Sequence, residues 1–222
     1  MISANEEYCK VDEEVEEFMK LFNVYINEDN TIKLSLILKK VIFIKNFVDN
    51  FDIENRHYKK YVIYDILMMF YSIKQNSIRN YYNYFRSFIE NFMRVNLKLN
   101  DSDETSVNNI YKRFNKLDKS DDKGLSNFLE EKYSYACNYV HSNIKANVNI
   151  YEYYKDIIES DEFNEVLVTK IFIELDELLD RCITFLIFIY TNEVDSNYYR
   201  KKKELKYIIG EGNFDLFNKL IQ

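Results

Sequence analysis

The stretch of residues 132–147, KYSYACNYVHSNIKAN, gathers the side chains of this chain that are best suited to chemistry. In a helix, residues three and four positions apart share a face. The polar residues that this spacing brings together are Asn138, His141, Ser142 and Lys145. An imidazole titrates near neutral pH, so His141 can take up or give a proton, while its neighbours donate, accept and carry positive charge. The stretch therefore predicts a helix face equipped for acid–base chemistry.

A second polar row lies in the predicted helix 77–99, which also carries a strong apolar stripe. Arg86, Glu90 and Arg94 are spaced by four residues, so their charges follow one face in the order plus, minus, plus. One interpretation is a ladder of surface ion pairs. The other is that Glu90 orients Arg86 so that its guanidinium points into a cleft shared with His141.

The only dense run of basic residues begins at Arg200, in a chain whose net charge is −7 and whose isoelectric point is about 5.1. Such a chain has no overall attraction for nucleic acid, so a contact with a phosphate backbone must come from a local patch. The run consists of Arg200, Lys201, Lys202, Lys203 and Lys206. It is interpreted either as the solvated start of a helix or as a phosphate contact.

Turn-forming residues are scarce, because the 222 residues include no proline and only three glycines. Sheet-rich folds need such turns, whereas apolar residues here recur at helical spacing. The sequence therefore predicts an all-α protein, a single-domain bundle of about seven or eight helices. The expected parts are N-terminal helices within residues 3–74, a core at 77–193 and short C-terminal helices at 196–222.

Capping residues and breaks in the apolar pattern predict the helix boundaries. Thr31 is expected to cap a central, nearly all-apolar helix at 32–50, after a loop. A long helix is expected at 161–193, and Gly210 and Gly212 are expected to end the helix before the last one. The other predicted helices span residues 54–74, 77–99, 125–147 and a short segment within 100–124.

Several functional classes have no support in the sequence. Cys9, Cys137 and Cys182 are too far apart for a metal-ligand pair, and His57 has no second ligand at suitable spacing. Phosphate-binding loops, dinucleotide-binding motifs and nucleophile elbows are absent. The apolar run 182–190 is far shorter than the ~20 residues of a membrane helix, and the acidic N-terminus does not resemble a signal peptide. We expect a cytoplasmic protein with no membrane segment, no metal and no cofactor.

The phrases FRSFIENFMR and YACNYVHSN, on two polar helices separated by a polar excursion, resemble core helices of HEPN domains. The resemblance covers residues 77–147, about a third of the chain. It implies a metal-independent endoribonuclease that acts at a homodimer interface, often as a toxin or an antiphage defence effector. It also implies RNA as the substrate and leaves room for a cognate protein partner.

The family motif usually places an arginine before the histidine, with four to six residues between them. In this chain those positions hold Ser134, Tyr135 and Ala136, so the motif arginine is missing. Asn138 keeps a polar group one turn before His141. Another arginine, Arg86, could supply the missing charge, or the domain could bind without cutting.

The implied chemistry needs little from the protein, because RNA carries its own nucleophile in the 2′-OH. His141 would act as general acid or base and Arg86 would hold the non-bridging phosphate oxygens, with Asn138 or Ser142 orienting the groups and Glu90 supporting Arg86. Lys145 and the basic run would contact RNA. The alternative is a non-catalytic helical module that binds RNA, a nucleotide or a partner protein, including one unrelated to HEPN domains.

Overall fold

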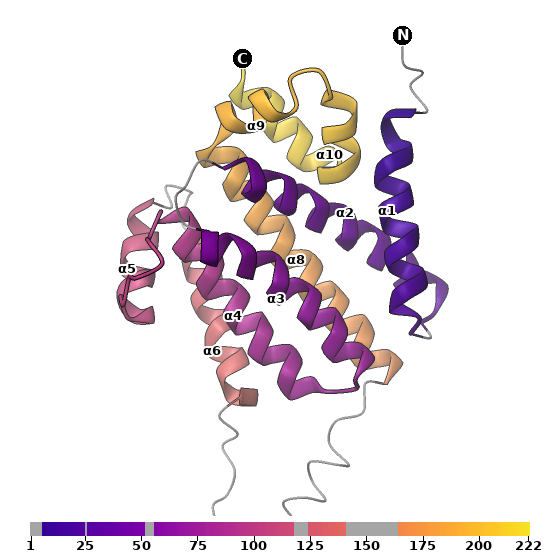
Figure 1. Cartoon of the computed structure of the whole chain (residues 1–222), viewed down its shortest axis with the longest axis vertical. Helices are drawn as coiled ribbons and strands as arrows, with labels where there is room; N and C mark the ends of the chain where they lie inside the picture. The colour runs from indigo at the N-terminus through magenta and orange to yellow at the C-terminus, as the bar shows by residue number, and fades with distance from the viewer. Residues whose placement is uncertain (1–5, 25, 52–55, 118–123, 141–163) are drawn as a thin grey trace, which may run out of the picture. The chain divides into compact units, whose positions relative to one another are not determined.

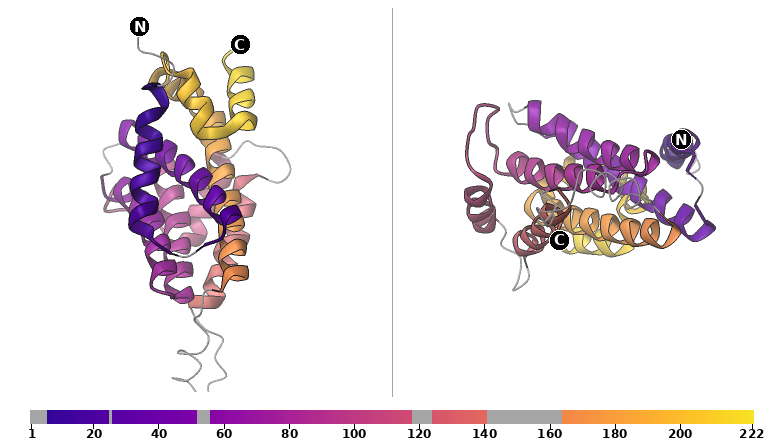
Figure 2. Two further views of the ribbon diagram at one scale, coloured as in Figure 1. Left: turned by 90° about the vertical axis from the view of Figure 1, so that its right-hand side faces the viewer. Right: turned by 90° about the horizontal axis from the view of Figure 1, so that it is seen from below.

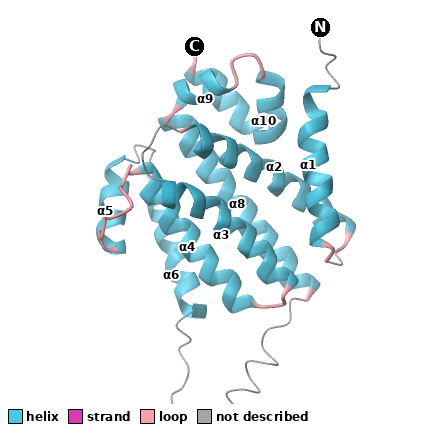
Figure 3. Cartoon of the chain, in the orientation of Figure 1, coloured by secondary structure: helices cyan, strands magenta, loops and turns pink. Residues whose placement is uncertain are grey.

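The computed structural model describes residues 6–24, 26–51, 56–117, 124–140 and 164–222. Of these described residues 85% are helical and none belongs to a strand (Figure 3). The prediction of an all-α fold is therefore confirmed. Its physical basis is the absence of proline together with apolar stripes of helical period.

The helices within the described residues are labelled in Figure 1. They are α1 (Glu6–Phe22), α2 (Glu28–Asn50), α3 (Arg56–Lys74), α4 (Ile78–Asn96), α5 (Val107–Leu117), α6 (Leu125–Val140), α8 (Glu165–Ile189), α9 (Thr191–Asn197) and α10 (Lys202–Leu220).

The contacts within the chain define two compact units. The first, here called the terminal unit, combines Met1–Asp52 with Thr169–Gln222. The second, here called the central unit, is the continuous stretch Ile53–Val168. The expected single domain with its core at residues 77–193 stays a prediction.

In the terminal unit, α2 is the central helix, as its nearly all-apolar sequence predicted. Leu34, Ile37 and Ile44 are at most 1% exposed, and α2 packs against α1, α9 and α10. The expected start of this helix at residue 32 was wrong. Asn27 is the N-cap, because its side chain accepts a hydrogen bond from the backbone N–H of Asn30 at 2.8 Å, and the helix begins at Glu28.

The long helix expected at 161–193 is broken at Tyr190, whose φ of −122° and ψ of 38° are not helical. The Tyr190 ring is buried against Phe47 and Phe51, with centroids 5.5 and 4.6 Å apart, so tertiary packing outweighs the local helical preference. Gly210 produces the expected interruption, because its φ of 80° and ψ of 170° kink α10. Both halves of α10 remain helical.

In the central unit, α3 and α4 form an antiparallel hairpin, and α4 also packs against α5 and α6 (Figures 1 and 2). The turn between α3 and α4 is closed by a hydrogen bond from the backbone N–H of Ser77 to the carbonyl of Ser72 at 2.9 Å. Phe85, Phe88 and Ile89 of α4 are fully buried, as their stripe predicted. In this packing, polar residues of α4 contact α6, the segment before α5 and α3.

Candidate functional site

Arg86 of α4 lies against the C-terminal half of α6. Its Nη1 is 3.9 Å from the thiol sulfur of Cys137, and its guanidinium carbon is 5.6 Å from the centre of the Tyr133 ring. Burial raises the pKa of the Tyr133 phenol, and the nearby positive charge of Arg86 offsets part of that rise. The phenol is therefore neutral at physiological pH and offers its ring face to a cation.

A second arginine of α4, Arg79, reaches the last residue of α6. Its Nη2 donates a hydrogen bond to the carbonyl oxygen of Val140 at 3.1 Å. A cation is favourable at that position, because the C-terminus of a helix carries unpaired carbonyls and partial negative charge. Arg79 was not among the predicted site residues. Its spacing of seven residues from Arg86 places both on one face of α4, and that spacing was visible in the sequence.

Glu90 is engaged by Arg94. Its Oε1 accepts hydrogen bonds from Arg94 Nε at 3.0 Å and from Nη2 at 2.8 Å. Arg94 is only 8% exposed, and its Nη2 also donates to the carbonyl of Thr105 at 2.9 Å. Arg94 therefore joins the half-buried Glu90 of α4 to the segment before α5. The expected orientation of Arg86 by Glu90 stays a prediction.

A third polar group lies where α4 faces α3. Asp65 is 2% exposed, and its Oδ2 accepts a hydrogen bond from Asn91 Nδ2 at 2.8 Å. The same nitrogen is 3.2 Å from Ser87 Oγ. Burial raises the pKa of Asp65 to about 6, and the hydrogen bonds from Ser87 and Asn91 limit the rise. Asp65 was not among the predicted site residues, although it is the only acidic residue of α3 and lies among apolar positions.

Three of the predicted site residues, His141, Ser142 and Lys145, lie outside the described residues. Asn138 is exposed on α6. Ala136, at one of the positions where the HEPN motif would hold an arginine, is completely buried. A guanidinium has no room at this position without a change in the packing around it.

The basic run lies in the terminal unit and is largely bound to acidic partners. Lys201 is 3.1 Å from Glu204, and Lys202 pairs with Asp195. Lys206 pairs with Glu211 at 2.5 Å, while Arg200 and Lys203 are exposed. Three of the five basic side chains thus have an acidic partner, and the phosphate contact stays a prediction.

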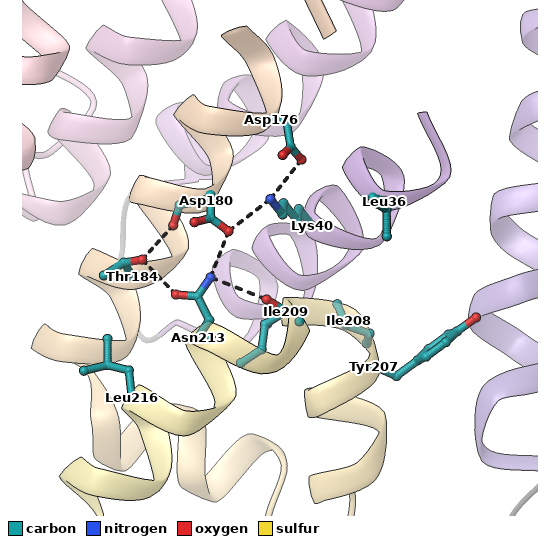
Figure 4. Close-up of a pocket in the computed structure, with 12 residues that line it drawn as sticks. Leu36, Lys40, Asp176, Asp180, Thr184, Tyr207, Ile208, Ile209, Asn213 and Leu216 are labelled. Atoms are coloured by element: carbon teal, nitrogen blue, oxygen red, sulfur yellow. Dashed lines mark hydrogen bonds and ion pairs between the residues drawn. The ribbon is translucent and has the colours of Figure 1, made fainter. Parts of the chain in front are cut away.

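A pocket of about 510 Å³ in the terminal unit was not anticipated from the sequence (Figure 4). Lys40 of α2 lies between two carboxylates of α8, with its Nζ 2.8 Å from Asp176 and 3.0 Å from Asp180. Asn213 of α10 donates from Nδ2 to Asp180 at 3.0 Å. The residues come from three helices that are far apart in the sequence, so no spacing could reveal the pocket.

The polar groups of this pocket satisfy one another. Lys40 has both carboxylates as partners, and the Asn213 side chain bonds to Asp180 and to Thr184. Gly210 and Gly212 line the pocket, and a Cβ at either position would meet nothing within 4 Å. We interpret the cluster as a clamp that holds the second half of α10 against α8 and α2.

Comparison with protein-family models, with curated proteins and with solved structures finds no match for this chain. Among the described residues, none of the helices has the length and hydropathy of a membrane span. The same residues contain no group of three or more His, Cys, Asp or Glu side chains that could hold a metal ion.

Proposed function

We propose that the protein is a HEPN-type endoribonuclease that cuts RNA without a metal ion. The observation that supports the proposal most is the approach of two arginines of α4 to the C-terminal half of α6. Arg86 reaches Cys137 and Arg79 reaches Val140, the residue directly before His141 in the sequence. An acid–base residue and phosphate-binding cations are the groups that this reaction needs.

In the proposed reaction, His141 takes the proton of the 2′-OH and the 2′-oxygen forms a bond to phosphorus. The bond from phosphorus to the 5′-oxygen then breaks as that oxygen takes up a proton, which gives a 2′,3′-cyclic phosphate and a free 5′-OH. Arg86 stabilises the additional negative charge on the phosphate oxygens. A second copy of the chain across a two-fold axis would bring another His141 and Arg86 to the same site.

The test is cleavage of a mixed-sequence RNA by the purified protein in EDTA. We expect the wild type to release 2′,3′-cyclic phosphate ends, and His141→Ala to reduce the rate ~10²–10⁴-fold, the usual cost of losing an acid–base residue. Arg86→Ala should also slow cleavage. Arg181→Ala is the matched control, because Arg181 is an exposed arginine on α8 that pairs with Glu177.

The proposal is wrong if the wild type does not cut RNA, or if His141→Ala cuts as fast as the wild type. A substrate with a 2′-deoxy nucleotide at the scissile position must also resist cleavage. Sedimentation velocity tests the dimer separately, since a protein that is active only as a monomer has no shared site.

A second candidate function is a module that binds RNA without cutting it. The buried Ala136 favours it, since the family motif would place an arginine in this part of α6. The two functions differ in one measurement. A binding module retains labelled RNA but leaves it intact under every condition in which the proposed nuclease would cut.

A further inference from the structure

Helix α3 is apolar on two opposite faces. Its inner face includes Val62, Ile66 and Met69, all fully buried. Its outer face carries large side chains that remain in solvent: Tyr61 is 37% exposed, Tyr64 44%, Leu67 43% and Tyr71 52%. Because residues three, four and seven positions apart share a helix face, these four form one continuous stripe, here called the tyrosine stripe.

The rings of the stripe adjoin one another. The centroids of Tyr61 and Tyr64 are 5.7 Å apart with an interplanar angle of 69°. The Tyr64 ring also contacts the ring of Tyr84 on the neighbouring α4, with centroids 6.5 Å apart and an interplanar angle of 78°. From Tyr61 to Tyr71 the stripe extends over roughly 15 Å, at about 1.5 Å per residue. It therefore offers several aromatic surfaces in a row along the α3–α4 hairpin, whose helices are labelled in Figure 1.

The helices α3 and α4 carry an excess of positive charge, although the chain as a whole carries −7 and the exposed Asp101 accepts a hydrogen bond from the backbone N–H of His57 at the start of α3. Between residues 56 and 96 there are seven Lys or Arg residues and two acidic ones. Of these two acids, Asp65 is buried, and Glu90, whose side chain is 29% exposed, is paired with Arg94. Lys60 and Lys74 are exposed near the two ends of the stripe. This hairpin therefore carries a net positive charge within an acidic chain.

We propose that the tyrosine stripe is the surface on which single-stranded RNA stacks its bases. Aromatic rings in a row accept unpaired bases of any sequence, and flanking lysines neutralise the backbone phosphates. This inference rests on the proposed function for its choice of RNA as the ligand. It assigns substrate binding to α3, a helix outside the Arg86 site.

Charge also distinguishes RNA from a second copy of the chain as the occupant. In a two-fold pairing of α3 with itself, the stripe of one copy would face the stripe of the other. Lys60 and Lys74 of one copy would then lie near the same lysines of the other copy, and their positive charges would repel. No exposed acidic residue on α3 would balance them. A polyanion with flat bases matches both the charge and the rings.

The test measures binding to a fluorescein-labelled, single-stranded 2′-O-methyl RNA of about 12 nucleotides, within the usual site sizes. This probe lacks a free 2′-OH and cannot be cut by the proposed mechanism, so binding is measured apart from catalysis. The triple variant Tyr61→Ala, Tyr64→Ala, Tyr71→Ala should raise the Kd at least ~10-fold, as expected when stacked bases lose their rings. The corresponding triple Phe variant should bind like the wild type, and the triple Leu variant should bind as weakly as the Ala variant.

Two controls complete the test. Tyr199→Ala removes a tyrosine that is 71% exposed in the terminal unit and should leave the Kd unchanged. Lys60→Gln with Lys74→Gln should reduce the slope of log K against log salt by about 1.4, or ~0.7 for each phosphate that the protein no longer neutralises.

Equal binding by the wild type and the triple Ala variant would overturn the proposal. So would full binding by the triple Leu variant, which would mean that apolar contact is enough, or absence of binding by the wild type. Loss of a dimer in the triple Ala variant, seen by sedimentation, would instead make the stripe a protein interface. If the wild type binds the probe but never cuts RNA, the proposed nuclease activity is refuted while the proposed role of the tyrosine stripe in RNA binding is retained.

Discussion

Arg79 Nη2 donates a hydrogen bond to the carbonyl oxygen of Val140 at 3.1 Å and so joins the first turn of α4 to the last residue of α6. In the proposed nuclease this bond fixes the backbone directly before His141. We expect Arg79→Met to lower kcat for RNA cleavage ~10-fold or more, because small displacements of reacting groups are costly. The bond is exposed, so the melting temperature should change little.

The control for this prediction is Arg79→Lys, which keeps the charge and should retain part of the activity. An Arg79→Met protein with wild-type kcat would show that the bond has no part in positioning. A rise in KM with an unchanged kcat would instead assign Arg79 to substrate binding.

The stability of the protein should depend on pH through Asp65. Burial raises the pKa of its carboxyl group from 3.8 to about 6, so between these pH values the folded state holds a proton that the unfolded state releases. The contribution to the free energy of unfolding is complete below about pH 4 and is lost as pH rises through about 6. Asp65→Asn removes the titration and keeps an oxygen that can accept from Asn91.

We therefore expect Asp65→Asn to gain stability relative to wild type as pH rises from 4 to 7, by about 1.4 kcal/mol for each unit of the pKa shift at most. Urea denaturation at both pH values measures the difference. Parallel stability curves for the two proteins would contradict the assignment.

The ion pair between Glu90 and Arg94 should contribute much more to stability than its spacing suggests. The Arg94 side chain is 10% exposed, and its removal would take from Glu90 this ion pair and from the carbonyl of Thr105 this hydrogen bond. We expect Arg94→Met to lower the free energy of unfolding by about 3 kcal/mol. Arg181→Met breaks a pair with the same i,i+4 spacing, but with side chains 43–44% exposed, and should cost less than ~0.5 kcal/mol. Similar losses for the two variants in urea denaturation would refute the distinction.

The two glycines of α10 should respond in opposite ways to alanine. Gly210 has a φ of 80°, so Gly210→Ala should destabilise by about 1 kcal/mol or more from backbone strain alone. Gly212 lies in the helix without a positive φ, so Gly212→Ala should stabilise by roughly 0.5–1 kcal/mol. A Cβ would meet nothing within 4 Å at either site, which isolates the backbone effect. If the melting temperatures of both variants shifted in the same direction, the backbone effect would not be the dominant one.

The helices could be predicted from the sequence because local patterns determine them. The apolar run of α2 and the apolar stripe of α4 predicted both helices, and Gly210 correctly predicted the interruption of α10. The start of α2 was misjudged because Asn27 and Thr31 are both good capping residues, and only the geometry shows which one caps. The break at Tyr190 could not be predicted, since its cause is contact with Phe47 and Phe51 from another helix.

Part of the candidate site could also be predicted, because it depends on spacing within one helix. Arg86, Glu90 and Arg94 stood out as a polar row on one helix, but that row cannot reveal that Arg94 is buried beside Thr105. Lys40 and Asn213 gave no signal at all, because their partners lie on α8, far away in the sequence. Spacing within one helix could be read from the sequence, whereas contacts between helices required the fold.

The terminal unit is built from two segments that are far apart in the sequence, and this affects how the chain folds during synthesis. A ribosome releases the chain from the N-terminus, so α1 and α2 emerge long before α8, α9 and α10, which complete their packing. The central unit is continuous and can close its contacts while the apolar residues of α2 still lack their partners. Nascent chains arrested before residue 169 should therefore expose α2 to proteases and to holdase chaperones, and this exposure should end only when the C-terminal helices have been synthesised.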